Sequence, residues 1–150
     1  MLEDQHTAFL ANVDMVELLR AHGITPTHQR IEIAQILFAK PQHLSAEQIL
    51  GLVNQQQALV SKATVYNTLG LFATQGLIRE VIVDPTKVFY DSNTCSHHHF
   101  YNVDTGTLMD IESERVSLGA LPTLPEGTVA AGVDVIIRVR NTVQDKPTHQ

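Results

Sequence analysis

The sequence predicts an α+β fold in which several short helices precede two groups of β-strands. Three observations lead to this prediction. Apolar residues recur at helical spacing as far as Gly76, apolar and polar residues alternate after it, and Asp-Pro-Thr at residues 84–86 is typical of a turn between strands. Helices followed by a two-stranded hairpin are the layout of a winged helix-turn-helix, although a general α+β domain with an extra hairpin fits this pattern equally well.

The first two predicted helices are bounded by residues that start and stop helices. The first lies within residues 9–23 and ends at Gly23, a residue that tolerates the left-handed conformation after a helix. Its expected inward-facing residues are Leu10, Val13, Val16 and Leu19. The second has Thr25 as its N-cap and Pro26 as its first residue, and it ends before Pro41. Its expected inward-facing residues are Ile33, Ala34, Ile36 and Leu37.

Two further helices follow. Ser45 and Gln48 have the spacing of a capping box, in which each side chain accepts a backbone N–H of the other residue. The expected inward face of this third helix consists of Ile49, Leu52 and Val53. The fourth helix opens at Ser61 and stops at Gly76, with Val65, Leu69 and Phe72 inward. Residues 77–83 and 87–91 then alternate and form the predicted hairpin, or wing.

The second part of the chain predicts a small α/β domain. Residues 98–103 and 106–111 read as a second hairpin, residues 112–121 as a short helix and residues 133–140 as a strand. A three-stranded sheet with one helix leaves strand edges and one face uncovered, so we expect this part to be a dimerisation domain and the protein to be a homodimer. The predicted domains are residues 1–91 and 92–150.

Composition limits the classes of protein that fit. The chain has 150 residues, 43% of them apolar, so a folded core is available. It contains one cysteine, which excludes an internal disulfide and a four-cysteine zinc site. No apolar run is long enough for a membrane span and the first residues do not resemble a signal peptide, so we expect a cytoplasmic protein without membrane contact. The net charge of −6 requires that any DNA contact come from a local basic patch.

The beginning of the fourth helix carries side chains suited to reading DNA. In a helix-turn-helix the second helix of the motif enters the major groove, where asparagine can pair with adenine and aromatic groups can pack on thymine methyls. The residues expected there are Lys62, Thr64, Tyr66, Asn67 and Thr68, with His28, Arg30 and Arg79 as further phosphate contacts. Taken singly, Tyr66 and Asn67 also fit ordinary, partly solvated positions of a helix.

Three consecutive histidines, residues 97–99, suggest a metal site. On a strand His97 and His99 share one face and His98 points to the other. Two imidazoles with a carboxylate suit Fe²⁺, Mn²⁺ or Zn²⁺, and Asp91, Asp110 and His43 are the candidate further ligands. A solvated polar loop is the alternative interpretation of the same three residues.

Five segments in this order and spacing resemble the ferric uptake regulator superfamily: TPTHQR, HLSAEQI, ATVYNTL, GLIREV and HHHF, within residues 12–140. The resemblance implies a dimeric, metal-responsive repressor that binds double-stranded operator DNA. It implies that Tyr66 and Asn67 contact bases. It also implies a regulatory Fe²⁺ or Mn²⁺ site, which Zn²⁺ can occupy in the purified protein, and its ligands are His43, Asp91, His97, His99 and Asp110.

The resemblance also separates branches of this superfamily. YDSNTCSHHHFY and the segment of residues 121–140 are most similar to the iron response regulator branch, which implies control of iron and haem homeostasis and haem binding at His97, His98 and His99. An aspartate at position 110 is instead similar to the peroxide-sensing regulators. Most of the superfamily has a CxxC pair that holds a structural zinc, whereas this chain has Asn102 and Thr105 there, so we expect that zinc to be absent.

Two other functional classes fit this sequence less well than a regulator. A metalloenzyme of the cupin type uses a His-x-His pair but requires a barrel of many strands, whereas the first 76 residues here read as helices. A metal or haem carrier would not need the SKATVYNTL segment. We therefore expect a regulator rather than an enzyme.

Overall fold

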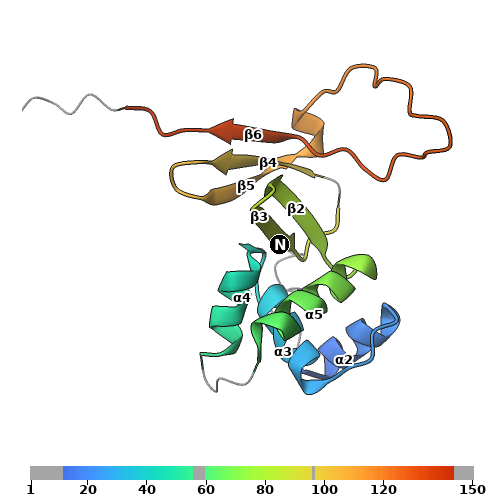
Figure 1. Ribbon diagram of the computed structural model, residues 1–150, viewed down its shortest axis with the longest axis vertical. Coiled ribbons are helices and arrows are strands. Elements are labelled where there is room, and N and C mark those ends of the chain that lie inside the picture. Colours follow the sequence, from blue (N-terminus) through green and yellow to red (C-terminus); the bar gives the residue numbers. More distant parts are fainter. Residues whose placement is uncertain (1–11, 56–59, 96, 144–150) are drawn as a thin grey trace, which may run out of the picture. The chain divides into compact units, whose positions relative to one another are not determined.

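The structure is a computed structural model that describes residues 12–55, 60–95 and 97–143 (Figure 1). The chain divides into two compact units, residues 1–94 and residues 95–150. In the described residues the first unit contains helices and a three-stranded sheet, and the second contains another three-stranded sheet. The predicted α+β class is therefore confirmed.

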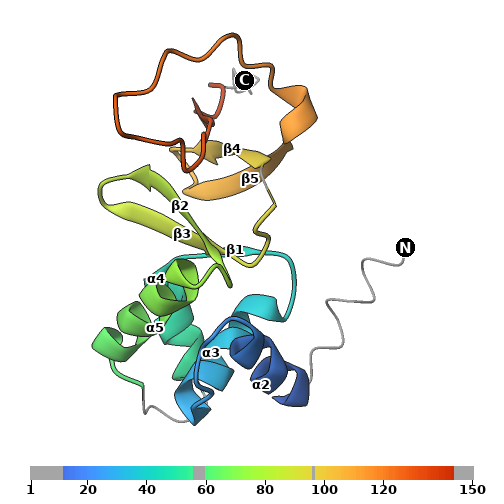
Figure 2. The same ribbon diagram turned by 90° about the vertical axis from the view of Figure 1, so that its right-hand side faces the viewer.

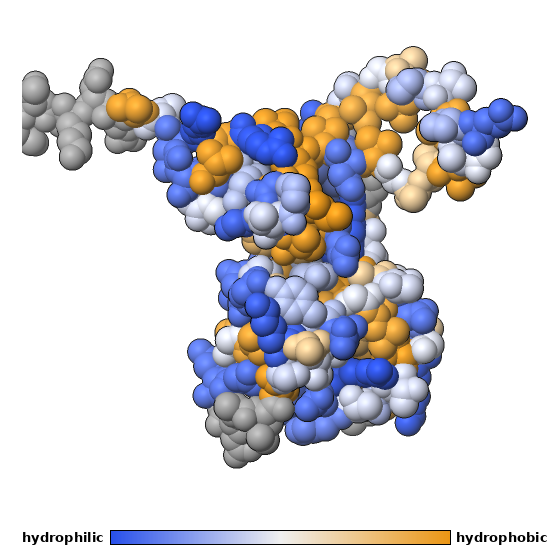
Figure 3. All heavy atoms as spheres, viewed as in Figure 1, coloured by the Kyte–Doolittle hydropathy of each residue, from blue (hydrophilic) through white to orange (hydrophobic). Residues whose placement is uncertain are grey.

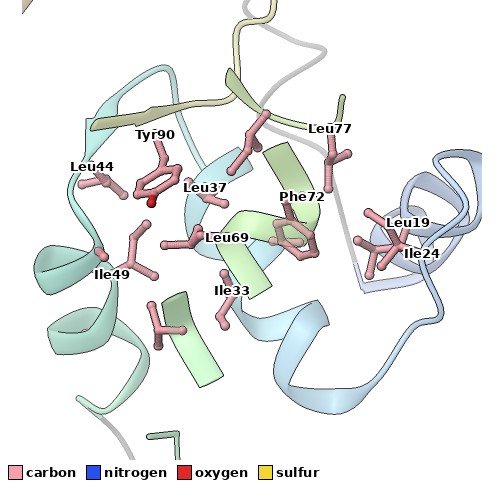
Figure 4. Close-up of a cluster of buried hydrophobic side chains, with 14 of the residues drawn as sticks. Leu19, Ile24, Ile33, Leu37, Leu44, Ile49, Leu69, Phe72, Leu77 and Tyr90 are labelled. Carbon is pink, nitrogen blue, oxygen red and sulfur yellow. The ribbon is translucent and has the colours of Figure 1, made fainter. Parts of the chain in front are cut away.

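The helices of the first unit surround one apolar core (Figures 2 and 4). Their bounds are α2 Asn12–Ala21, α3 His28–Phe38, α4 Ala46–Val53 and α5 Lys62–Thr74. Leu19, Ile33, Ile49, Leu69 and Phe72 from these four helices are fully buried and meet in this core. Burying a side chain of this size contributes about 1.5–3 kcal/mol, so the core is the main stabilising element of this unit. Among the described residues, none of the helices has the length and apolar character required to cross a bilayer.

The start of α3 differs from the prediction. Thr27, not Thr25, is the N-cap, and its hydroxyl accepts the Arg30 N–H at 3.3 Å. The Thr25 carbonyl instead accepts a hydrogen bond from the Arg30 guanidinium at 2.8 Å. Pro26 therefore precedes the helix, because Thr27 lies at the position from which a side-chain oxygen reaches the N–H three residues later.

The other helix boundaries agree with the sequence. Ser45 and Gln48 form both bonds of the capping box, at 2.9 and 3.2 Å. Ser61 caps α5 by accepting the Thr64 N–H at 3.1 Å. Gly23 and Gly76, which follow α2 and α5, have positive φ angles of 72° and 75°, a conformation that favours glycine.

Two assignments to the apolar core need correction. Leu52 was expected to face inward but is 40% exposed, because it borders a hollow between α3 and α4 rather than the core. Met15, which the helical spacing did not single out, is fully buried one turn before Leu19. Leu10 lies outside the described residues.

The sheet of the first unit contains the predicted hairpin and one additional strand. The hairpin consists of β2 Arg79–Asp84 and β3 Lys87–Asp91, and β1 His43–Leu44 pairs with the other edge of β3. All pairs are antiparallel. β1 was not foreseen, because two residues are too few to show a period. At the turn, Asp84 accepts hydrogen bonds from the N–H and hydroxyl of Thr86, both at 2.7 Å, and these bonds lower the pKa of the Asp84 carboxyl.

The second unit is built on a central strand, β4. Its strands are β4 His97–Asn102, β5 Thr107–Glu112 and β6 Ile136–Val139, in the order β5-β4-β6. β5 is antiparallel to β4, and β6 is parallel to it. The hairpin predicted for this part of the chain is therefore present, and β4 has a neighbour on each side.

The connection between β5 and β6 contradicts the predicted helix over residues 112–121. It begins with a single 3₁₀ turn, Ser113–Arg115, and residues 116–135 contain neither helix nor strand. Gly119, Pro122 and Pro125 explain this, since glycine and proline both disfavour a continuing helix. The strand predicted over residues 133–140 is shortened to β6, in which Ile137 is 41% exposed.

Asn102 closes the turn between β4 and β5. Its side-chain oxygen accepts the N–H groups of Asp104 and Thr105, at 2.9 and 3.1 Å. Its amide group donates to the side chain of Asn141 at 2.8 Å, and the Asn141 N–H donates to Asp104 at 2.9 Å. A hydrogen-bonded network thus joins the turn to the chain after β6, at the positions where the resemblance places zinc-binding cysteines.

We predict that Asn102→Ala lowers the free energy of unfolding by about 1–3 kcal/mol, because buried or bridging hydrogen bonds of this kind contribute about 1 kcal/mol each. Asn141→Ala removes one of the three bonds that the Asn102 side chain makes, so its effect should be smaller. Urea unfolding of both variants and the wild type measures the difference. Equal stability of Asn102→Ala and the wild type would show that the network does not hold the turn.

Candidate metal centre and DNA-binding face

His97 and His99 lie on one face of β4 and converge on a carboxylate of β5. The strand register places His99 directly opposite Asp110. The Nε2 atoms of His97 and His99 lie 3.2 and 3.3 Å from the same Asp110 oxygen, Oδ1. The two imidazole rings are 4.5 Å apart at an angle of 60°. Three ligand atoms of the kinds that divalent metals prefer therefore lie together within the second unit.

A backbone hydrogen bond orients the His97 ring. Its Nδ1 lies 2.6 Å from the carbonyl oxygen of Cys95. A carbonyl can only accept, so Nδ1 carries a hydrogen and donates it. In the neutral ring this leaves the lone pair on Nε2, the atom that faces Asp110, as in many metal-binding histidines. The ring is thus held in the tautomer that a metal requires.

His98 has a different role from its neighbours. It points to the other face of β4, and its Nδ1 accepts the Val135 N–H at 3.0 Å. This bond fixes the segment that leads into β6 against the central strand. Of the three histidines suggested for haem, His98 therefore already uses its Nδ1 atom in a hydrogen bond to the backbone of the second unit.

His43 and Asp91 form a second pair of candidate ligands, in the first unit. They lie directly opposite each other on β1 and β3, and His43 Nε2 is 3.0 Å from Asp91 Oδ2. The other carboxylate oxygen of Asp91 accepts the Asn93 N–H at 2.8 Å, which fixes the orientation of the group. Both side chains are largely buried. An imidazole and an oriented carboxylate suit the same metals as the cluster on β4 and β5.

Arg79, one of the expected phosphate contacts, is the first residue of β2. It lies opposite Asp91 on the other edge of β3. Directly opposite residues of paired strands have their side chains on the same side of a sheet. Asp91 of β3 therefore has His43 of β1 on one side and the positively charged Arg79 of β2 on the other.

The DNA-binding candidates lie at the beginnings of α3 and α5. One hollow is lined by residues from both places, and five of the eight candidates border it: His28, Arg30, Thr64, Asn67 and Thr68. His28 also lies 3.0 Å from Glu32, and the Thr64 hydroxyl is 2.9 Å from that of Ser61. Thr68, expected to contact DNA, is only 5% exposed, so its buried side chain offers little to a DNA base.

Lys62 and Tyr66 lie on the exposed surface of α5 outside this hollow. The Lys62 ammonium is 5.8 Å from the centre of the Tyr66 ring, and Tyr66 is 40% exposed. The Tyr66 hydroxyl donates a hydrogen bond to Glu47 of α4 at 2.5 Å. The sequence does not single out Glu47, because glutamate is common in the first turn of a helix and no local pattern indicates a partner 19 residues away.

Comparison with known proteins agrees with the earlier resemblance. The family model described as the ferric uptake regulator family matches residues 21–120. The peroxide-responsive repressor PerR of Staphylococcus aureus (strain Mu50 / ATCC 700699) is 28% identical over 104 residues, which are 69% of this chain and 70% of that protein.

Solved structures show the same fold. The ferric uptake regulator from Pseudomonas aeruginosa with manganese has a TM-score of 0.62 at 24% identity, covering 83% of this chain and 96% of that one. The ferric uptake regulator from Francisella tularensis with iron has a TM-score of 0.65 at 21% identity, and the match covers 79% of this chain and 92% of that one. The chain belongs to the ferric uptake regulator family, whose members are transcription regulators and not enzymes.

Proposed function

We propose that this protein is a metal-responsive repressor that binds operator DNA as a homodimer in the cytoplasm. The observation that carries the proposal is the convergence of His97 Nε2 and His99 Nε2 on one oxygen of Asp110. Two nitrogen lone pairs and a carboxylate directed at one place repel each other unless a proton or a metal cation lies between them. The donor set fits Fe²⁺ or Mn²⁺, and Zn²⁺ can occupy it in the purified protein.

We further propose that His43 and Asp91 complete this site. Five residues, 92–96, separate Asp91 from His97, so covalent connection alone keeps their Cα atoms within about 20 Å. The pair in the first unit offers two ligand atoms and the triple in the second unit offers three, whereas the two sets together offer five N and O atoms. A metal bound by all five would favour one arrangement of the DNA-binding unit on the dimerisation unit.

Within the first unit, the beginnings of α3 and α5 form the face proposed to bind DNA. Tyr66 and Asn67 are the proposed base contacts, and Lys62, His28, Arg30 and Thr64 are the proposed contacts to phosphate. The chain has a net charge of −6, so the contacts to phosphate must come from the basic side chains gathered on this face.

The second unit supports the proposed homodimer. Apolar side chains are exposed on β5, on β6 and along residues 116–135 (Figure 3). The largest of them are Met109, Leu118, Leu121, Leu124, Val129 and Ile137. Exposed apolar surface of this extent is typical of a protein interface. A second copy would cover it without any structural zinc, since Asn102 and Thr105 occupy the positions of the cysteines.

Two signals fit the site. The likeness of residues 90–101 and 121–140 to the iron response regulator branch supports control by iron or haem, which we favour. Asp110 and the peroxide-responsive relative support peroxide sensing as the second candidate. Haem binding at His97 would displace Asp110 from the imidazole. Peroxide sensing would instead add oxygen to His43 or His97.

The proposal predicts different products for the two signals. Haem addition should produce a Soret band that is lost in His97→Ala if haem is the signal. Treatment with Fe²⁺ and peroxide should instead add one oxygen atom to His43 or His97 if peroxide is the signal, as detected by peptide mass spectrometry. A protein that shows neither product would respond to metal supply alone.

We predict that Tyr66→Ala and Asn67→Ala each reduce the preference for operator DNA by about 1–3 kcal/mol while leaving binding to random DNA nearly unchanged. Thr74→Ala, at the other end of α5, is the matched control and should bind as the wild type does. Binding measured on a duplex selected by the wild type and on a scrambled duplex tests this. Equal loss on both duplexes would show that neither residue reads bases.

His97→Ala and His99→Ala should abolish the dependence of DNA binding on added Mn²⁺, because each removes a ligand from the cluster. Both variants should keep the circular dichroism spectrum and dimeric mass of the wild type. His22→Ala is the control, since His22 contacts the Leu18 carbonyl in the first unit and lies outside the cluster. A normal Mn²⁺ response in His97→Ala would contradict the metal site.

The dimer should survive a strong chelator, because apolar strand packing rather than zinc is proposed to hold it. Sedimentation before and after chelation measures the mass. Dissociation into monomers on chelation would show that a metal holds the interface.

A further inference from the structure

The hydrogen bond between Tyr66 and Glu47 joins the two helices of the helix-turn-helix. Glu47 lies in the first turn of α4, and Tyr66 lies one turn into α5. The phenol donates to Glu47 Oε1, and the Lys62 ammonium lies near the ring. Lys62, Tyr66 and Glu47 thus form one exposed cluster, in which Lys62 and Tyr66 are proposed DNA contacts and Glu47 is not.

The electrostatics of the cluster agree with this geometry. The hydrogen bond from the Tyr66 phenol lowers the pKa of the Glu47 carboxyl, and the positive charge of Lys62 lowers it further. The same hydrogen bond raises the pKa of the Tyr66 phenol, because it stabilises the protonated hydroxyl and places a negative charge beside it. At neutral pH an ionised carboxylate therefore accepts from a neutral phenol.

A carboxylate on a surface that faces DNA needs an explanation. It repels phosphates, so it weakens binding to DNA of any sequence. It also restricts Tyr66, whose exposed ring would otherwise sample several rotamers. A side chain fixed before binding loses less conformational entropy when it packs against a base. Glu47 thus lowers general affinity and favours contacts that depend on the position of Tyr66.

We propose that Glu47 is a positioning residue for sequence recognition: it holds the phenol of Tyr66 in the orientation that reads the operator, without contacting a base itself. This inference rests on the proposed DNA-binding function. It assigns part of the sequence preference to a residue of α4, the helix that precedes the recognition helix.

Binding by Glu47→Ala, Tyr66→Phe and the double variant tests the coupling. The probes are a duplex selected from a randomised library by the Mn²⁺-loaded wild type and a scrambled duplex of equal length. Glu47→Ala should weaken binding to the selected duplex by about fivefold, the scale of one hydrogen bond, without weakening binding to the scrambled duplex. Tyr66→Phe should have a similar effect, and the double variant should be no weaker than either single variant.

Two control variants separate the positioning of Tyr66 from the loss of a negative charge. Glu17→Gln removes one exposed carboxylate from α2 and should leave the preference unchanged. Glu47→Gln keeps an acceptor for the phenol, so it should retain most of the preference lost in Glu47→Ala. Absorbance titration of phenolate, with Tyr66→Phe subtracted, should show that the pKa of Tyr66 falls toward its usual value in both Glu47 variants.

The outcomes are distinguishable. A wild type that binds both duplexes equally overturns the DNA-reading function and this inference with it. A wild type with a clear preference that Glu47→Ala retains overturns the inference alone. Additive losses in the double variant, or tighter binding of Glu47→Ala to the selected duplex, would also overturn it, because they mean independent action or competition for the phenol.

Discussion

The antiparallel pairing of β4 with β5 is the interaction on which the second unit depends. Its register sets His99 opposite Asp110, and the spacing of two along β4 brings His97 to the same carboxylate oxygen. A slip of one residue would turn these candidate ligands to opposite faces of the sheet. The turn at Asn102, held through Asn141 to the end of β6, fixes that register. Hydrogen bonds distant from the imidazoles therefore determine their geometry.

A short path connects the candidate ligands of the first unit to the proposed DNA-binding face. His43 of β1 pairs with Asp91 of β3. Ser45, two residues after His43, caps α4. The first turn of α4 carries Glu47, which binds Tyr66 of α5. A ligand that fixes His43 would thus act on a strand joined directly to the helix that positions the proposed base-reading tyrosine. Such a path is a physical route for coupling, and the coupling itself requires measurement.

Local sequence signals predicted most of the fold. The capping box at Ser45, the stops at Gly23 and Gly76 and the turn at residues 84–86 all depend on neighbouring residues, and all are present. The helix over residues 112–121 was wrong because Gly119 and the prolines after it outweigh a weak helical pattern. β1, the buried state of Thr68 and the bond from Glu47 to Tyr66 depend on contacts between distant segments, which no local period reveals. Strand alternation placed His97 and His99 on one face, but the alignment of Asp110 with them depends on the register of the hairpin.

The proposal that residues of both units bind one metal ion is tested most directly by pulsed electron paramagnetic resonance of bound Mn²⁺. The method counts the imidazole nitrogens coupled to the ion. The account predicts three coordinating imidazoles in the wild type, from His43, His97 and His99, and two in His43→Ala. The same count in His43→Ala and the wild type would show that the histidine of the first unit takes no part in the site.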